Sequence, residues 1–82
     1  MNAGRDLPRY SMLIQWSDEN AAFLVPFPEW QGRVFNPITH GETYEEAARN
    51  GTEALVGLVA SARQHDELLP EPRTTRSVAL PA

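Results

Sequence analysis

The sequence contains no cysteine, which excludes disulfides and thiolate metal sites. It also contains no lysine, so all seven basic residues are arginines. No stretch approaches the roughly 20 apolar residues that a membrane-spanning helix needs, and the first residues lack the apolar core of a signal peptide. Internal repeats, heptads and low-complexity tracts are absent as well. These absences predict a cytoplasmic protein of simple domain organisation.

The length of 82 residues limits the chain to one domain. A chain of this size buries only about 60% of the surface that its unfolded form exposes, so its stability alone is marginal. Because no disulfide is available, we expect a partner subunit and predict a homo-oligomer, either a dimer or a tetramer. The polar residues 1–8 are predicted to form a flexible arm, and residues 9–82 a single domain.

Apolar residues recur with a period of two in the first part of the chain. Alternate side chains in YSMLIQW share one face, which predicts a strand over residues 9–16. The polar residues Ser17–Asn20 suit a hairpin turn, and a second strand is predicted over residues 21–27. A short third strand is predicted over residues 33–38, where Pro37 interrupts it.

At Thr43 the apolar period changes to 3.6, which predicts an amphipathic helix over residues 43–64. Thr43 is expected to cap this helix, and Glu46 stands three residues later, as in a capping box. Gly41 is expected to allow a sharp turn before the helix. Gly51 lies within the apolar stripe of small residues, where it allows close packing of the helix on a sheet.

A last short strand is predicted over residues 76–80. The predicted order of elements is therefore β-β-β-α-β. This order indicates an α+β domain with a mostly antiparallel sheet that is covered by one helix.

The sequence carries no motif for catalysis or for binding a metal or cofactor. His40 and His65 each lie beside one acidic residue, but no third ligand stands at a metal-binding spacing. A glycine-rich phosphate loop and a GxSxG nucleophile are both absent. We predict that the protein is not an enzyme and holds neither a metal nor a cofactor.

Acidic residues are concentrated in the middle of the chain. Between Ser17 and Ala48 six acids stand against one arginine, which gives a net charge of −5. This charge disfavours nucleic acid and suits a basic protein partner, although on charge alone ordinary solubility and the dipole of the helix explain it better. Trp30 is interpreted either as half-buried against its own sheet or as the anchor of an interface. The predicted partner surface consists of Asp18, Glu19, Glu29, Trp30, Glu42 and Glu45.

Several short motifs follow one another in a recognisable order. FPEWQG (27–32) follows the hairpin, GETYEEA (41–47) begins the helix, and LPEP (69–72) follows it. Over residues 9–72 this order resembles the HicB-like antitoxin family, although the link between Gly32 and Gly41 is longer than the family pattern and Arg33 stands where many members have cysteine.

The resemblance implies a truncated ribonuclease-H-like domain without nuclease activity. It implies an antitoxin that binds and blocks a small, basic, mRNA-cleaving toxin of the HicA type. Many members also carry a C-terminal DNA-binding domain, which this sequence lacks, so DNA binding is not expected of this chain alone. The alternative is an orphan structural or regulatory module of the same fold that self-associates and has a different partner.

Overall fold

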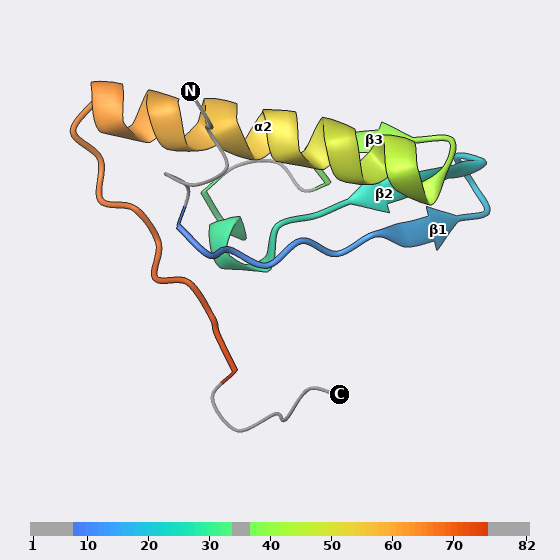
Figure 1. Cartoon of the computed structure of the whole chain (residues 1–82), viewed down its shortest axis with the longest axis horizontal. Coiled ribbons are helices and arrows are strands. Elements are labelled where there is room, and N and C mark those ends of the chain that lie inside the picture. The colour runs from blue at the N-terminus through green and yellow to red at the C-terminus, as the bar shows by residue number, and fades with distance from the viewer. Residues whose placement is uncertain (1–7, 34–36, 76–82) are drawn as a thin grey trace, which may run out of the picture.

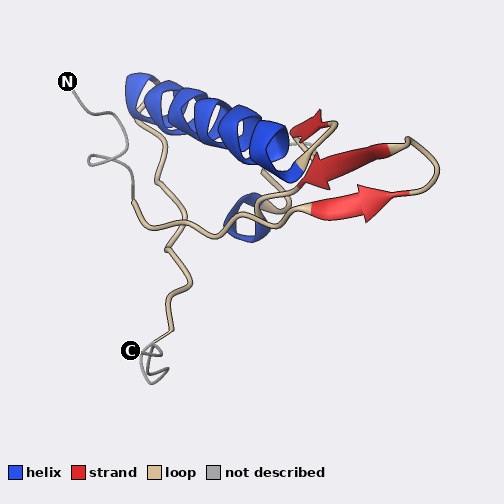
Figure 2. Ribbon diagram, turned by 45° about the vertical axis from the view of Figure 1, so that its right-hand side comes forward, coloured by secondary structure: helices blue, strands red, loops and turns tan. Residues whose placement is uncertain are grey.

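The computed structural model describes residues 8–33 and 37–75. Its elements are β1 (Gln15–Ser17), β2 (Ala22–Val25), the 3-10 helix η1 (Pro28–Trp30), β3 (Thr39–Gly41) and α2 (Tyr44–Gln64) (Figure 1). The three strands form an antiparallel sheet in the order β1-β2-β3, and α2 packs along one face of it (Figure 2). The predicted α+β class is therefore confirmed for the described residues.

The first two strands lie in the predicted segments but are shorter. β1 begins near the end of the predicted strand over 9–16 and extends one residue beyond it, and β2 lies inside the predicted 21–27. Pro26 directly follows β2 and has no N–H to donate to a ladder. Its carbonyl still accepts a hydrogen bond from the Leu13 N–H (3.2 Å), so the two chain segments stay adjacent beyond the paired residues.

The predicted position of the third strand, residues 33–38, is wrong, because β3 is formed by Thr39–Gly41. Pro37 lies in a bend, and residues 34–36 are outside the described part of the chain. The register of the sheet explains why the third strand lies later in the chain than predicted. Its last pair joins Gly41 to Phe23, so β3 ends just before the chain enters α2. The predicted strand over 76–80 and nearly all of the predicted arm over 1–8 lie outside the described residues.

The hydrophobic core lies between α2 and the sheet, and its largest fully buried side chains are Phe27, Val25 and Val59. Trp30 joins this core at 3% exposure and packs edge-on against Tyr10, with the ring centroids 5.5 Å apart. Trp30 is therefore more deeply buried than the half-buried position that the sequence suggests. Its indole Nε1 has no hydrogen-bond partner within the described residues, so packing holds this side chain in place.

The start of α2 is set by local hydrogen bonds. The Thr43 hydroxyl accepts a hydrogen bond from the Glu46 N–H (3.0 Å), which confirms Thr43 as the N-cap. The Glu46 carboxylate, however, accepts from the Glu42 N–H (3.0 Å), not from the cap residue that a capping box would use. The Glu42 N–H, which precedes the helix, therefore still has an acceptor. Glu42, Glu45 and Glu46 all lie near the positive end of the helix dipole.

The end of α2 at Gln64 agrees with the predicted boundary. Asp66 adopts the left-handed conformation with φ of 54°. The Glu67 N–H donates to the Ala62 carbonyl (2.9 Å) and the Asp66 N–H donates to the Arg63 carbonyl (3.3 Å). This pair of bonds is a Schellman motif, and it turns the chain away from the helix axis.

Candidate functional site

The structure divides the six residues of the predicted partner surface into two groups. Glu29 and Trp30 have exposed fractions of only 7% and 3%, so both are removed from the accessible surface of the chain. The other four residues are exposed carboxylates from the hairpin turn and the helix start: Asp18, Glu19, Glu42 and Glu45.

The Glu29 carboxylate is enclosed by hydrogen-bond donors. Its oxygens accept from the Ser11 N–H (3.0 and 3.1 Å), from the Ser11 hydroxyl (3.1 Å) and from the Arg73 N–H (2.8 Å). Burial tends to raise the pKa of Glu29, but the hydrogen bonds from Arg73, from its own N–H and from Ser11 outweigh it and leave the pKa lowered. This carboxylate joins two extended segments that are distant in the sequence, which is a structural role.

Residues 67–75 follow α2 and run past the end of the domain that holds η1, and we call them the C-terminal strap. The Tyr10 hydroxyl donates to the Pro70 carbonyl (2.7 Å), and the Arg33 guanidinium donates to the Leu68 carbonyl. Together with the bond between Glu29 and Arg73, these contacts fix the strap to the end of the domain that holds η1 (Figure 1). The motif LPEP contributes the Pro70 carbonyl to this attachment, and the flanking residues Leu68 and Arg73 contribute the other two bonds.

At the opposite end of the domain, three aromatic rings lie in a row. Trp16 pairs with Phe23 across the two strands, and their ring centroids are 5.0 Å apart at an angle of 71°. Phe23 in turn contacts Tyr44, the first residue of α2, with centroids 4.3 Å apart. Trp16 is 49% exposed and Tyr44 is 67% exposed. The row therefore links β1, β2 and the helix start and leaves two large rings at the surface.

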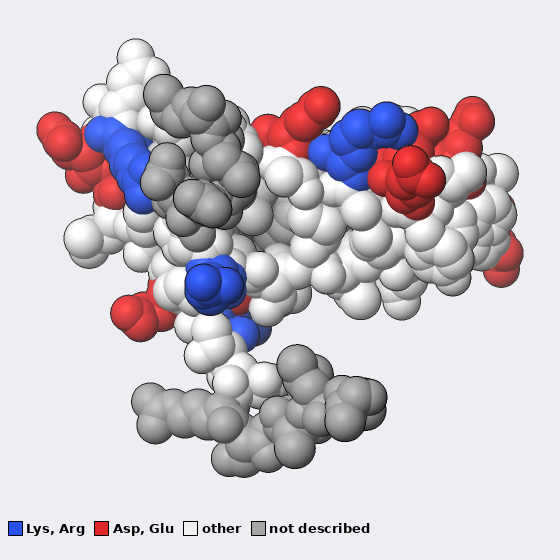
Figure 3. Space-filling view, in the orientation of Figure 1, with Lys and Arg blue, Asp and Glu red and all other residues white. Residues whose placement is uncertain are grey.

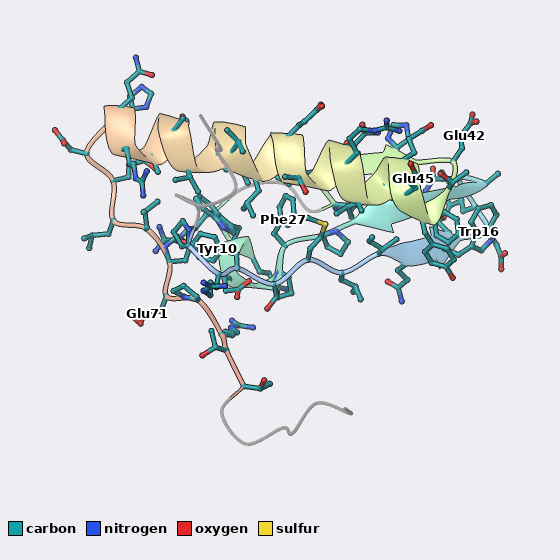
Figure 4. All side chains as sticks on the ribbon, viewed as in Figure 1. Tyr10, Trp16, Phe27, Glu42, Glu45 and Glu71 are labelled. Carbon is teal, nitrogen blue, oxygen red and sulfur yellow. The ribbon has the colours of Figure 1, made fainter. Side chains whose placement is uncertain are left out.

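The four exposed carboxylates lie at this same end of the domain. The Trp16 Nε1 donates to Asp18 Oδ1 (2.9 Å), and Figure 4 shows Glu42, Glu45 and Trp16 at the same end of the molecule. Figure 3 shows several acidic side chains over this end of the molecule, with a basic side chain beside them on α2. We call this region the acidic aromatic surface, and it consists of Trp16, Asp18, Glu19, Phe23, Glu42, Tyr44 and Glu45.

The sequence did not identify the two exposed rings as part of a surface. Trp16 belongs to the alternating apolar face of the first strand, and Tyr44 belongs to the apolar stripe of the helix, so the pattern assigns both to the core. Trp16 is the middle residue of the short strand β1 and Tyr44 is the first residue of α2, and neither belongs to the buried core cluster that contains Phe27 and Val25. The signal that could have found them is their position beside a turn that carries acids.

The sheet face opposite α2 is not covered by any described element. Phe23 and Gly41 are paired and face α2. The next pair along the strands, Leu24 and His40, therefore points to the opposite face. Two hollows of about 380 and 210 Å³ open there, and the described residues that line them carry no carboxylate and no arginine. Leu13, which lines the smaller hollow, is 46% exposed. The lining is mixed, because the polar side chains of Asn20, Gln31 and His40 lie beside apolar residues such as Leu13 and Leu24.

Within the described residues, no three His, Asp or Glu side chains come together in a way that could hold a metal ion. Across the same residues, α2 and η1 are the helices, and neither is long and apolar enough to cross a membrane. His65 lies just beyond α2, where its Nδ1 is 2.8 Å from the Ser61 carbonyl oxygen.

Comparison with known protein families, with curated proteins and with solved structures finds no match. The likeness to HicB-like antitoxins therefore rests on the order of the sequence motifs alone.

Proposed function

We propose that this protein is an antitoxin-like binding module of the cytoplasm, which neutralises a small basic toxin of the HicA type by direct protein–protein contact. The order of the HicB-like motifs supports the family, and the three antiparallel strands with one helix are compatible with a truncated ribonuclease-H-like domain. In this function the chain itself has no catalytic residues, needs no cofactor and does not bind DNA alone.

The observation that carries the proposal is the acidic aromatic surface. A toxin that binds RNA needs a basic surface for the phosphates. Four exposed carboxylates would steer such a surface toward the antitoxin and match its charge. Trp16 and Tyr44 would supply the large, desolvated contacts that usually carry most of the binding energy. An antitoxin that covers the RNA-binding surface needs no enzymatic activity to block cleavage.

The proposal is tested with the product of the neighbouring reading frame and a messenger-RNA substrate. We expect that product to cleave the RNA, the antitoxin alone to leave it intact, and the mixture to leave it intact as well. Trp16→Ala is expected to weaken binding by about 2 kcal/mol, mainly through faster dissociation. Glu42→Gln with Glu45→Gln is expected to slow association, and less so at high salt. Surface plasmon resonance at two salt concentrations measures both rates.

The matched control is Glu53→Gln, which removes an exposed acid from α2 outside the acidic aromatic surface. It should change neither rate beyond the small effect of one unit of net charge. If Trp16→Ala and the double glutamine variant both behave like Glu53→Gln, this surface does not contact the toxin.

A second function is favoured by the uncovered sheet face. The hollows on this face are lined by no carboxylate and no arginine, so self-association would bury the face against its copy without bringing like charges together. In the alternative function, the protein is a self-associating structural or regulatory module with a different partner. In the antitoxin function, the same contact makes the homo-oligomer that the small core calls for.

Leu13→Glu tests this contact, because it places a charge in the smaller hollow on the uncovered face. We expect the wild-type chain to form a dimer or tetramer of its 9.2 kDa protomer at micromolar concentration, and Leu13→Glu to be a monomer. Leu68→Glu is the control, since Leu68 is 86% exposed on the strap and distant from the sheet. Light scattering gives the masses, and a monomeric wild-type chain would refute self-association.

A further inference from the structure

The exposed indole of Trp16 is held in a fixed orientation before any partner arrives. Its Nε1 donates to Asp18 Oδ1 (2.9 Å), and the Phe23 ring packs edge-on against it. A hydrogen bond to a carboxylate increases the electron density of the indole, which strengthens its attraction for a cation above the ring. The pair of Trp16 and Asp18 therefore presents an aromatic face and an anion side by side, with one half of the indole still open to solvent.

The charges around this ring decide what can bind there. Nucleic-acid bases stack on exposed aromatic rings, but Asp18 beside the ring and Glu42 and Glu45 at the same end of the domain would repel the phosphates that accompany them. A purely apolar partner would bury those carboxylates without a counter-charge, which is strongly unfavourable. A basic protein segment avoids both penalties, because it neutralises the acids while it covers the rings.

We infer that the acidic aromatic surface is a site for an arginine side chain of the partner, whose guanidinium stacks on the Trp16 indole and bonds in its plane to Asp18. The inference rests on the proposed function for the identity of the partner, but not for the chemistry of the site. A carboxylate has about four acceptor positions, so the bond from Trp16 Nε1 leaves Asp18 able to accept from a guanidinium.

Arginine fits this site better than lysine for two physical reasons. The guanidinium is planar and weakly hydrated, so it stacks on an indole while its N–H groups stay free to bond to carboxylates at the edge of the ring. A lysine ammonium is a compact and strongly hydrated charge, which must lose water to approach the ring and has no plane to stack. A preference for arginine over lysine at equal charge is therefore the property that distinguishes this site from a merely acidic surface.

The experiment compares two short peptides that are identical except that one carries three arginines and the other three lysines. Isothermal titration calorimetry with the full chain is expected to show tighter binding of the arginine peptide, by about threefold to tenfold. Trp16→Ala and Asp18→Asn should each bring this ratio close to one. Glu53→Gln, an exposed acid outside the site, should leave the ratio unchanged. Tryptophan fluorescence of the wild-type chain should respond to the arginine peptide through Trp16, because Trp30 is buried.

Each outcome bears on the inference. Equal affinity for the two peptides, no binding of either, or an arginine preference that survives Trp16→Ala would overturn it. None of those results would contradict toxin neutralisation, which is measured separately with the toxin itself. An arginine preference that depends on Trp16, together with no binding of the neighbouring gene product, would support the site and direct the search to a different basic partner.

Discussion

Glu29→Ala is expected to lower the free energy of unfolding by roughly 2–4 kcal/mol, one of the largest effects of a single side chain in this domain. The change leaves the Ser11 N–H, the Ser11 hydroxyl and the Arg73 N–H without the carboxylate that accepts from them. Glu29→Gln keeps one acceptor oxygen but turns an amide toward a donor, so we expect a smaller loss of about 1–2 kcal/mol. Urea unfolding followed by tryptophan fluorescence measures both.

Glu71→Gln is the matched control, because Glu71 is an exposed acid on the same strap. Its effect should stay within about 0.5 kcal/mol. If Glu29→Ala were as mild as Glu71→Gln, the carboxylate would not hold the strap to the domain. Binding to the partner gives a second readout: Glu29 lies at the η1 end, so Glu29→Gln should leave the dissociation rate of the toxin unchanged.

The pH dependence of stability follows from the same carboxylate. The pKa of Glu29 is lowered from its ordinary value of 4.5, so protonation favours the unfolded chain. The contribution of Glu29 is therefore complete above about pH 4.5 and is lost as the pH falls through the folded-state value. Wild-type stability should decline more steeply below this pH than that of Glu29→Gln. Equal slopes for the two proteins would contradict the assignment.

How far the sequence predicts this fold depends on how local each signal is. The helix is found correctly because its period, its cap at Thr43 and its end near His65 are all written within one segment. The role of Glu29 is not local: its donors, Ser11 and Arg73, are 18 and 44 residues away in the chain. A carboxylate in a turn-like FPEWQG segment looks solvent-exposed unless those distant segments are known to converge on it.

The candidate site likewise combines features that the sequence predicts with features that depend on long-range contacts. The charge count predicts a group of acids in the middle of the chain, and the structure leaves Asp18, Glu19, Glu42 and Glu45 exposed but buries Glu29. The exposure of Trp16 and Tyr44 depends on where the core ends, and that is set by the pairing of β1 with β2 and by the point at which α2 begins. Hydrophobic periodicity identifies the face of an element but not the end of the core along it.

Gly41→Ala is expected to destabilise the domain by roughly 1–3 kcal/mol and to disturb the acidic aromatic surface at the same time. A Cβ at this position would lie 2.4 Å from the Ala47 nitrogen and 2.7 Å from the Ala47 Cα, both of which belong to the helix backbone. Because backbone atoms cannot move aside as a side chain can, the first turn of α2 must shift away from β3. Tyr44 and Glu45 lie on that turn and would move with it. The predicted role of Gly41 as a turn residue is therefore replaced by one of close approach.

Gly51 confirms the close packing that its place in the apolar stripe predicts, but its neighbours differ. An added Cβ there would meet the Met12 sulfur at 2.8 Å and Val25 Cγ1 at 3.0 Å. The methionine is flexible and can adjust, so Gly51→Ala should cost less than Gly41→Ala. The two substitutions separate a contact with side chains from a contact with the helix backbone.

Gly57→Ala is a control for Gly41→Ala that should stabilise the domain. Nothing lies within 4 Å of an added Cβ at Gly57, and the residue is exposed within the helix. It should raise the free energy of unfolding by about 1 kcal/mol. Gly41 and Gly57 share no contacts, so the effects of Gly41→Ala and Gly57→Ala should add in the variant that carries both substitutions. That variant recovers stability without restoring the helix start, and we therefore expect its binding to the arginine peptide to stay as weak as that of Gly41→Ala. Recovery of binding along with stability would show that Gly41→Ala weakens binding only by unfolding the domain. Binding of the arginine peptide would then not depend on the position of the first helical turn.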